Sequence, residues 1–385
     1  MSERVRVLVV DDSALMRKLI PAILARDPSI EVVGTAMDGA FALKKIEELR
    51  PDVVTLDLEM PRMDGMETLR LIMQRAPIPV ILFSTHSREG AYSTFKALAL
   101  GAIDFVAKPK DAAAGHLDVI GDQLIEKIKV AKRAGRSKPA APVIVDATPQ
   151  KKATRAALPP NRIIAIGIST GGPNALQFML SQIPGDFPAS LVIVQHMPEG
   201  FTEMFSRRLD ECCAIDVHEA KSGALLVAGR ALICPGNRHL MVRRMPRGDM
   251  AVLSDGPAVN GHRPSADVLF HSVAQQFGLT AVGVIMTGMG DDGAEGLGAI
   301  KAAGGMTLAQ SEDTCVVSGM PHAAIQKGHV NKIVPLDGLG AYLVSQYGGG
   351  RAHGEKADKS EKLEKIDKPE KQEKNERTSV SSHRT

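Results

Sequence analysis

Short runs of apolar, mostly β-branched residues alternate with helix-length amphipathic segments along the first third of the chain. Between Val5 and about Lys132 these runs are VRVLVV, EVVGTA, VVTLD, PVILFS and DFVAKP. Alternation of this kind is typical of βα units, whose strands form a parallel sheet covered by helices on both faces. We therefore predict a doubly wound α/β domain over residues 1–132.

The same alternation returns between Arg162 and about Tyr347. Its strand candidates are RIIAIGI, SLVIVQH, RALICP, AVGVIMTG and MTLAQS, and two further runs, HLMVRR and MAVLSD, are joined by the turn MPRGD. Two strand-like runs joined by a short turn are typical of an antiparallel hairpin. We predict a second, mainly parallel α/β domain over residues 162–347 that contains one hairpin.

Two segments lack both periods. Residues 133–161 are rich in Ala, Pro, Lys and Arg, which is typical of a semi-extended linker. Residues 348–385 contain repeated acid-Lys-x triplets with few apolar residues, and such a segment cannot bury enough surface to offset its ordering entropy. We predict a disordered tail. A single helix held by Glu–Lys pairs is the alternative, although Pro369 argues against its continuation.

Composition argues against several classes of protein. The 385 residues carry a formal net charge of +3, contain no Trp and are only 3% aromatic, so we do not expect nucleic acid as a partner. The four cysteines show no CxxC spacing, which fits a reducing compartment. Because no apolar stretch reaches ~20 residues and the N-terminal run resembles a buried strand, we expect no membrane insertion, no signal peptide and a cytoplasmic location.

Polar residues follow the predicted strands of the first domain. Asp11 and Asp12 come after VRVLVV, Asp57 closes VVTLD, Ser84 closes PVILFS, and Lys108 lies in FVAKP. Because the carboxyl ends of parallel strands share one edge, these side chains should meet there. Crowded carboxylates repel one another unless a cation lies among them, and oxygen ligands suit Mg²⁺. We predict a phosphoryl site with Asp57 as nucleophile, although Asp11 or Asp12 alone is equally well explained as a helix cap.

This arrangement, together with the loop EMPRMDG and Lys108-Pro109, resembles the receiver domain of two-component response regulators, which has a flavodoxin-like fold. The resemblance implies that Asp57 accepts a phosphoryl group from a histidine kinase. It assigns Mg²⁺ binding to Asp12, Asp57 and the Glu59 carbonyl with Asp11 assisting, phosphoryl contact to Lys108 and Ser84, and the aromatic switch position to Phe105. Ser84 is preferred to Thr85 because it comes first after the strand.

The stretch GISTGG, at the end of RIIAIGI, has two interpretations. A dinucleotide site needs Gly-x-Gly-x-x-Gly and an acidic residue after the next strand, but here Ser169 occupies the middle position and the next strand ends in His196. The alternative is a strand-turn-helix elbow of the GxSxG kind, which presents a serine hydroxyl. A helix that begins near Pro173 would bring its N-terminal amides close to that hydroxyl.

A serine nucleophile needs an imidazole base and a carboxylate behind it. His196 ends the strand SLVIVQH, and Asp291 and Asp292 follow AVGVIMTG, so all three residue types come from strand ends at one edge. His262, in GHRPS, is the most serious rival base. We assign its loop, which includes Arg263, to substrate contact.

The second domain resembles the catalytic domain of the chemotaxis protein-glutamate methylesterases, which has a Rossmann-like fold. The resemblance rests on IGISTGG, QHMPEGF, DGPAVNGHRPSADVLFHS, GVIMTGMGDDGAEG and CVVSGMP, in that order. It implies Ser169 as nucleophile, His196 as general base and Asp292 as orienting carboxylate, with Thr170 and Met289 lining the site. Ile168 stands where the family commonly has Ala, and Asp291 where it often has Asn.

The combined resemblance implies a phosphorylation-activated hydrolase that removes γ-methyl esters from glutamates of chemoreceptors and deamidates particular receptor glutamines. The expected partners are methylated chemoreceptors and a chemotaxis histidine kinase. Mg²⁺ is expected for receiver phosphorylation and no cofactor in the esterase site. The alternative is a response regulator whose second domain binds a nucleotide or partner without catalysis; a DNA-binding output fits less well, and sequestration of the kinase by the receiver is compatible with esterase activity.

Overall fold

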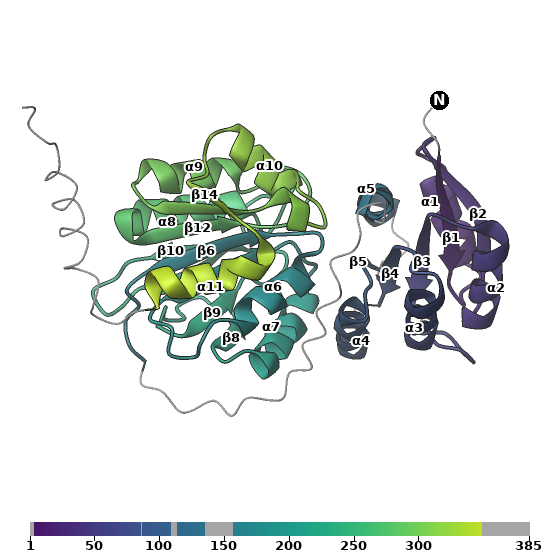
Figure 1. Ribbon diagram of the computed structural model, residues 1–385, viewed down its shortest axis with the longest axis horizontal. Helices are drawn as coiled ribbons and strands as arrows, with labels where there is room; N and C mark the ends of the chain where they lie inside the picture. The colour runs from purple at the N-terminus through teal and green to yellow at the C-terminus, as the bar shows by residue number, and fades with distance from the viewer. Residues whose placement is uncertain (1–3, 86, 109–113, 135–156, 349–385) are drawn as a thin grey trace, which may run out of the picture. The chain divides into compact units, whose positions relative to one another are not determined.

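The structure is a computed structural model that describes residues 4–85, 87–108, 114–134 and 157–348 (Figure 1). Most of the predicted linker, the predicted tail after Gly348, and Pro109 lie outside these residues. Two separate parallel sheets are present, together with a two-stranded antiparallel sheet. The predicted α/β class with two mainly parallel sheets is therefore confirmed.

The first sheet contains the five strands predicted from the apolar runs, in the order β2-β1-β3-β4-β5, all parallel. Its elements are β1 (Val5–Val10), α1 (Met16–Leu24), β2 (Ile30–Ala36), α2 (Gly39–Leu49), β3 (Val53–Asp57), α3 (Gly65–Arg75), β4 (Val80–Ser84), α4 (Arg88–Ala99), β5 (Asp104–Ala107) and α5 (Ala114–Ala134). The strand order reverses beside β1, which makes β1 and β3 neighbours. Crevices at such a reversal are the usual ligand sites of open α/β sheets.

The second sheet has seven strands in the order β14-β13-β12-β6-β7-β9-β8. Its strands are β6 (Ile163–Ile168), β7 (Ser190–Gln195), β8 (Asp216–Glu219), β9 (Arg230–Ile233), β12 (Ala281–Ile285), β13 (Met306–Gln310) and β14 (Lys332–Val334). Every residue of β6, β7 and β12 is buried, which explains their uninterrupted apolar runs. The edge strands β8 and β14 were not predicted because they are short and only partly buried.

Helices cover both faces of this sheet. Figure 1 shows α8 (Ala266–Phe277), α9 (Ala294–Ala302) and α10 (Gly319–Gln326) on one face, and α6 (Gly172–Ser181), α7 (Phe201–Cys212) and α11 (Leu336–Tyr347) on the other. Two short 3₁₀ turns, η1 (Gly278–Thr280) and η2 (Glu312–Thr314), complete the domain. In the part of the chain that the structure describes, none of the helices combines the length and the apolar character needed to cross a bilayer.

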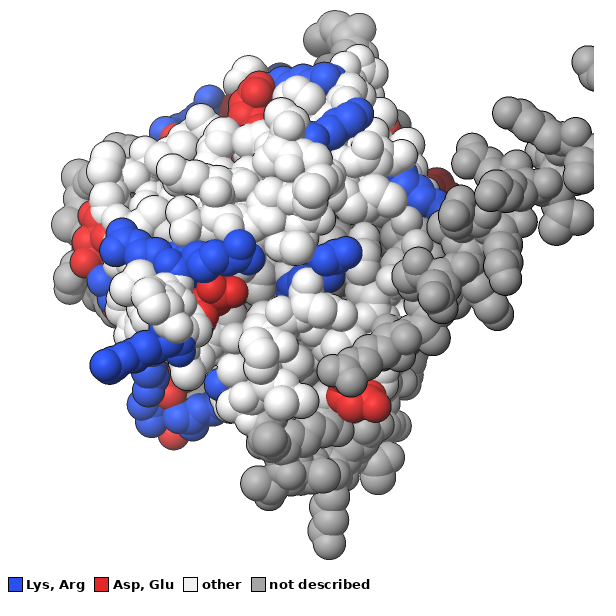
Figure 2. Space-filling model, turned by 90° about the vertical axis from the view of Figure 1, so that its left-hand side faces the viewer, with Lys and Arg blue, Asp and Glu red and all other residues white. Residues whose placement is uncertain are grey.

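The predicted hairpin is confirmed as β10 (His239–Arg243) paired with β11 (Met250–Ser254). Near its tip, Arg244 lies over the ring of Phe277 at 4.7 Å and within 3.7 Å of Asp249. Figure 2 shows one face of the molecule, on which Lys and Arg side chains form separate groups between uncharged areas. The positive charge on this face is therefore distributed in groups.

Candidate functional site

The GISTGG stretch forms a turn between strand β6 and helix α6. Ser169 follows β6 directly, and its backbone N–H donates to the Thr287 carbonyl at 2.9 Å. Gly171 precedes the helix with a φ of +74°, a backbone conformation that residues with a side chain rarely adopt. A Cβ at this position would also lie 2.5 Å from the Cβ of Val316. The structure therefore has the predicted strand-turn-helix elbow, with Ser169 partly exposed at its bend.

His196 and Asp292 come together at the same edge of the sheet. His196 follows β7, Asp292 lies in the loop after β12, and β6 is the strand between β12 and β7. The Nε2 of His196 is 2.8 Å from Oδ2 of Asp292. Adjacent strand ends thus supply the three residue types that the sequence singled out.

Asp292 is fully buried and receives several hydrogen bonds from the start of α8. Ser265 Oγ donates to its Oδ1 at 2.6 Å, and the Ala266 N–H donates to its Oδ2 at 2.6 Å. Burial alone would raise the pKa of Asp292, but the hydrogen bond and charge of His196, with these donors, lower it to about 2. Asp291 is exposed, so Asp292 is the acid that orients toward His196.

The ring of His262 stacks on the ring of His196, with centroids 4.0 Å apart and planes 10° from parallel. Burial, and then the charge of His196, lower the pKa of His262 to about 4, so this ring is neutral at neutral pH. The Nδ1 of His196 is buried and has no hydrogen-bond partner among the residues that the structure describes. It is therefore the nitrogen left to accept a proton. No local pattern indicates this stack, beyond the presence of a second histidine.

The three predicted lining residues have different surroundings. Thr170 is buried, and its carbonyl accepts from Thr287 Oγ1 at 2.9 Å, whereas Met289 is partly exposed. Arg263 donates from Nε and Nη2 to the Asn237 side chain at 3.0 and 2.6 Å, and from Nη1 to the Gly256 carbonyl at 3.1 Å. In this structure Arg263 therefore joins two loops.

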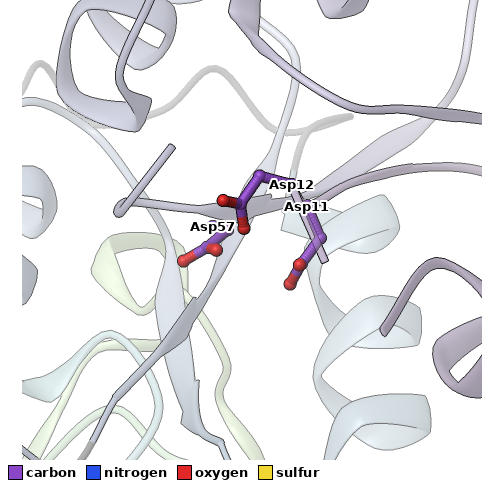
Figure 3. A group of neighbouring side chains, drawn as sticks. All are labelled: Asp11, Asp12 and Asp57. Atoms are coloured by element: carbon purple, nitrogen blue, oxygen red, sulfur yellow. The ribbon is translucent and has the colours of Figure 1, made fainter. Parts of the chain in front are cut away.

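The first sheet presents the predicted acidic pocket. Carboxylate oxygens of Asp11, Asp12 and Asp57 lie within 4.8 Å of one another. Figure 3 shows that Asp11 and Asp12 come from one segment of the chain and Asp57 from another. Three hard oxygen donors at the ends of neighbouring strands β1 and β3 fit Mg²⁺, which binds through few carboxylates and keeps several waters.

Lys108 contacts two of these acids. Its Nζ is 2.6 Å from Oδ2 of Asp57 and 3.2 Å from Oδ2 of Asp11. Burial raises the pKa of Asp57 to about 6, although the hydrogen bond and charge of Lys108 work against the rise. Burial works to lower the pKa of Lys108, but the hydrogen bond and charge of Asp57, with those of Asp11, outweigh it and raise that pKa. Lys108 is therefore cationic and lies where an anion on Asp57 would be held.

The other predicted residues of the first domain, Ser84 and Phe105, are both buried. Ser84 is buried, with Oγ 2.7 Å from Thr94 Oγ1 and 3.3 Å from the Gly90 carbonyl. Thr85 Oγ1 donates to Oε1 of Glu59 at 3.0 Å. Phe105 is buried. The hydroxyl of Ser84 is thus bonded to helix α4 in this structure.

Several polar side chains that hydrogen-bond to the candidate active-site residues or beside them could not be identified from the sequence. Ser265 bonds Asp292, and Asn260 Nδ2 donates to Oδ2 of Asp267 at 2.8 Å beside it. Gln195 is buried and donates to the backbone of both Ser169 and His196. The only sequence signal for Gln195 is an amide that ends an apolar strand.

The low pKa of Asp292 predicts a pH-dependent contribution to stability. Its folded pKa of about 2 lies below the usual 3.8, so the contribution is complete above pH ~5 and declines as the pH falls toward 2. Between pH 5 and pH 3 we expect the wild type to lose about 1 kcal/mol more of unfolding free energy than Asp292→Asn. Urea unfolding at both pH values measures this difference. Asp291→Asn is the control, and an equal loss in all three proteins would contradict the assignment.

Comparisons with known proteins identify the family of each domain. Residues 164–343 match the CheB methylesterase family, and residues 7–119 match the response regulator receiver domain. A relative from Koribacter versatilis, named protein-glutamate methylesterase/protein-glutamine glutaminase 2, is 62% identical over 348 residues, covering 89% of this chain and 96% of the relative.

Two further relatives are named for the same two activities. The relative from Anaeromyxobacter dehalogenans is 48% identical and covers 87% of this chain and 94% of its own length. The relative from Symbiobacterium thermophilum is 45% identical and covers 91% of this chain and 100% of its own length. The chain therefore belongs to the CheB methylesterase family and carries a response regulator receiver domain before its methylesterase domain.

Proposed function

We propose that this protein hydrolyses glutamate γ-methyl esters on chemoreceptors, and deamidates receptor glutamines, through Ser169, His196 and Asp292. The observation that carries the proposal is the 2.8 Å contact between His196 and Asp292 at the sheet edge that also bears Ser169. The names of the relatives, which include both activities, support the substrate class. The substrate lies on the cytoplasmic part of the receptors, and the protein acts there.

In the proposed reaction, Oγ of Ser169 attacks the ester carbonyl while Nδ1 of His196 takes its proton. The proton on Nε2 stays directed at Asp292, whose ionised carboxylate stabilises the imidazolium that forms. The tetrahedral intermediate collapses, and His196 returns the proton to the departing methanol. Water then hydrolyses the acyl-enzyme by the same route. With a glutamine, ammonia leaves instead.

Backbone amides beside the elbow supply the stabilisation of the oxyanion. Within residues 157–348, no hydrogen bond is described for the amide N–H of Thr170 or of Met289. Thr170 follows Ser169 in the elbow, before the N-terminus of α6, where unpaired N–H groups and the helix dipole favour negative charge. We assign these two amides to the oxyanion site.

Methanol release from methylated receptor membranes tests the nucleophile. We expect Ser169→Ala to release at least 10³-fold less methanol than the wild type, because the covalent route needs the hydroxyl. Ser181→Ala is the matched control, since its hydroxyl bonds the Phe178 carbonyl within α6 and should leave turnover unchanged. Normal turnover by Ser169→Ala would exclude the proposed triad.

We further propose that phosphorylation of Asp57 controls the esterase. An oxygen of Asp57 attacks the phosphorus of a phosphohistidine of the phosphodonor, a chemotaxis histidine kinase in the cell. The P–N bond breaks, the imidazole of the donor leaves and takes up a proton, and Lys108 then contacts the phosphoryl oxygens. Asp12, Asp57 and the Glu59 carbonyl, with Asp11 nearby, would hold Mg²⁺, which would supply charge neutralisation for this transfer. The aspartyl phosphate carries about two negative charges where the ionised carboxylate carried one, in a pocket where Lys108 now pairs with Asp57.

Contacts between aromatic rings offer a route from this pocket to the esterase site. The rings of Phe105 and Phe201 are 4.7 Å apart, and those of Phe95 and Phe205 are stacked at 5.2 Å. Phe201 and Phe205 belong to α7, which begins five residues after His196. Asn174 of α6 also donates to the Leu98 carbonyl at 2.8 Å. The receiver thus contacts both helices that follow the candidate catalytic residues.

Removal of one of these rings tests the control. We expect Phe205→Ala to raise the methanol release of the unphosphorylated protein several-fold, because it weakens the contact that holds the receiver against α7. The stimulation by acetyl phosphate and Mg²⁺ should shrink to the same extent. Phe41→Ala, which removes a largely exposed ring of α2, is the control. Unchanged basal release in Phe205→Ala would contradict inhibition through this contact.

A further inference from the structure

The side chain of Gln195, the last residue of β7, bridges the two chain segments that carry Ser169 and His196. Its Nε2 donates to the Ser169 carbonyl at 2.9 Å and to the His196 carbonyl at 3.2 Å. The residue is only 2% exposed. One amide group therefore touches the backbone of both the proposed nucleophile and the proposed base.

The position of this amide follows from where the sheet ends. The pairing of β6 with β7 stops at Ile168 opposite Gln195, and the His196 N–H donates to the Ile168 carbonyl at 3.0 Å. Beyond that bond the segment after β6 turns into α6, and the segment after β7 enters the loop before α7. The carbonyls of Ser169 and His196 therefore have no partner on a neighbouring strand. Buried carbonyls need donors. The carboxamide of Gln195 supplies the donor for the His196 carbonyl, and for the Ser169 carbonyl it adds a second donor to the Gly172 N–H, which lies at 2.8 Å.

Its orientation is determined by these contacts, because only the NH₂ end of a carboxamide can face two carbonyl oxygens. Oε1 then lies against Gly172, and a Cβ on Gly172 would be 2.2 Å from it. No donor for this buried oxygen is present among the described residues. The last glycine of GISTGG, Gly172, thus leaves room for the amide of Gln195, which explains its presence without a phosphate.

We propose that Gln195 is a positioning residue, whose amide sets the backbone of Ser169 relative to that of His196. The inference rests on the proposed triad. Loss of the bridge frees the elbow to move against the base, and a displacement of about 1 Å in such geometry can cost ~10²-fold in rate. The amide faces backbone and not the substrate, so kcat should fall while KM stays nearly unchanged.

The test measures methanol release and the rate at which a fluorophosphonate probe labels Ser169, using the full chain. We expect Gln195→Met to lower kcat and the labelling rate by ~10- to 100-fold, with KM within about 3-fold of wild type. Gln195→Glu should lose as much, because a carboxylate oxygen would face two carbonyls. Gln182→Met is the matched control, since its amide bonds a single carbonyl of α6, that of Phe178, and should leave both rates unchanged.

Gly172→Ala approaches the same contact from the other side. Its methyl group would displace the amide of an intact Gln195, so we expect a comparable fall in kcat. In a Gln195→Met background the same change should add little, because the two substitutions disrupt one contact. If the glutamine variants are unfolded by circular dichroism, the kcat and labelling rate of Gly172→Ala alone decide the matter, because this variant keeps Gln195 and disturbs the same contact.

The outcomes separate this inference from the proposed function. If the probe does not label Ser169 of the wild type, the triad itself is wrong. If the wild type is labelled and folded Gln195→Met retains its rate within about 3-fold, or if KM rises while kcat is unchanged, Gln195 does not position the site. Full additivity of Gly172→Ala with Gln195→Met would also overturn the proposal.

Discussion

Parallel pairing of three neighbouring strands, β12, β6 and β7, is the constraint on which the candidate active site depends. Each strand is buried along its whole length, so its register against its neighbours is set by the core. Because all three run in the same direction, their ends deliver Asp292, Ser169 and His196 to one edge. Two residues 96 positions apart in sequence can therefore meet at 2.8 Å. The loops need only supply short turns.

The buried carboxyl groups of Asp292 and Asp57 have environments that shift their pKa values in opposite directions. Asp292, in the loop after β12, faces the start of α8. Ser265, Ala266 and the imidazole of His196 donate to it, and its pKa falls to about 2 despite burial. Asp57 is buried beside Asp11, and its pKa rises to about 6 although Lys108 is close. The first carboxylate stays ionised and orients a ring. The second has fewer donors, so burial dominates and its pKa rises.

Helices α6 and α7 lie between the receiver and the candidate active site. Each begins just after a candidate catalytic residue, and each contacts the receiver, α6 through Asn174 and α7 through Phe201 and Phe205. Gln195 lies between the starting points of both helices and bonds the backbone on either side. A shift of either helix would therefore act on the elbow through a small number of hydrogen bonds. The receiver therefore contacts the two helices that begin beside the candidate active site.

Most of the strands, and the residues that stand at their ends, can be predicted from local sequence alone, because apolar runs bounded by glycine or charge are strong local signals. Asp11, Asp57, Lys108, Ser169 and His196 were all found in this way. Weak local signals were missed: β8 and β14 are short and only partly buried. These strands depend on their neighbours for pairing.

Which of Asp291 and Asp292 contacts His196 could be learned only from the three-dimensional structure. Adjacent acids on a loop are equivalent in sequence, and only Asp292 is buried against His196. The stack of His262 on His196 and the amide bridge of Gln195 are likewise contacts between segments far apart in sequence. No local pattern encodes a hydrogen bond to a carbonyl 26 residues away. Strand ends can be predicted from composition and period, but the polar contacts that orient the groups at those ends depend on packing in three dimensions.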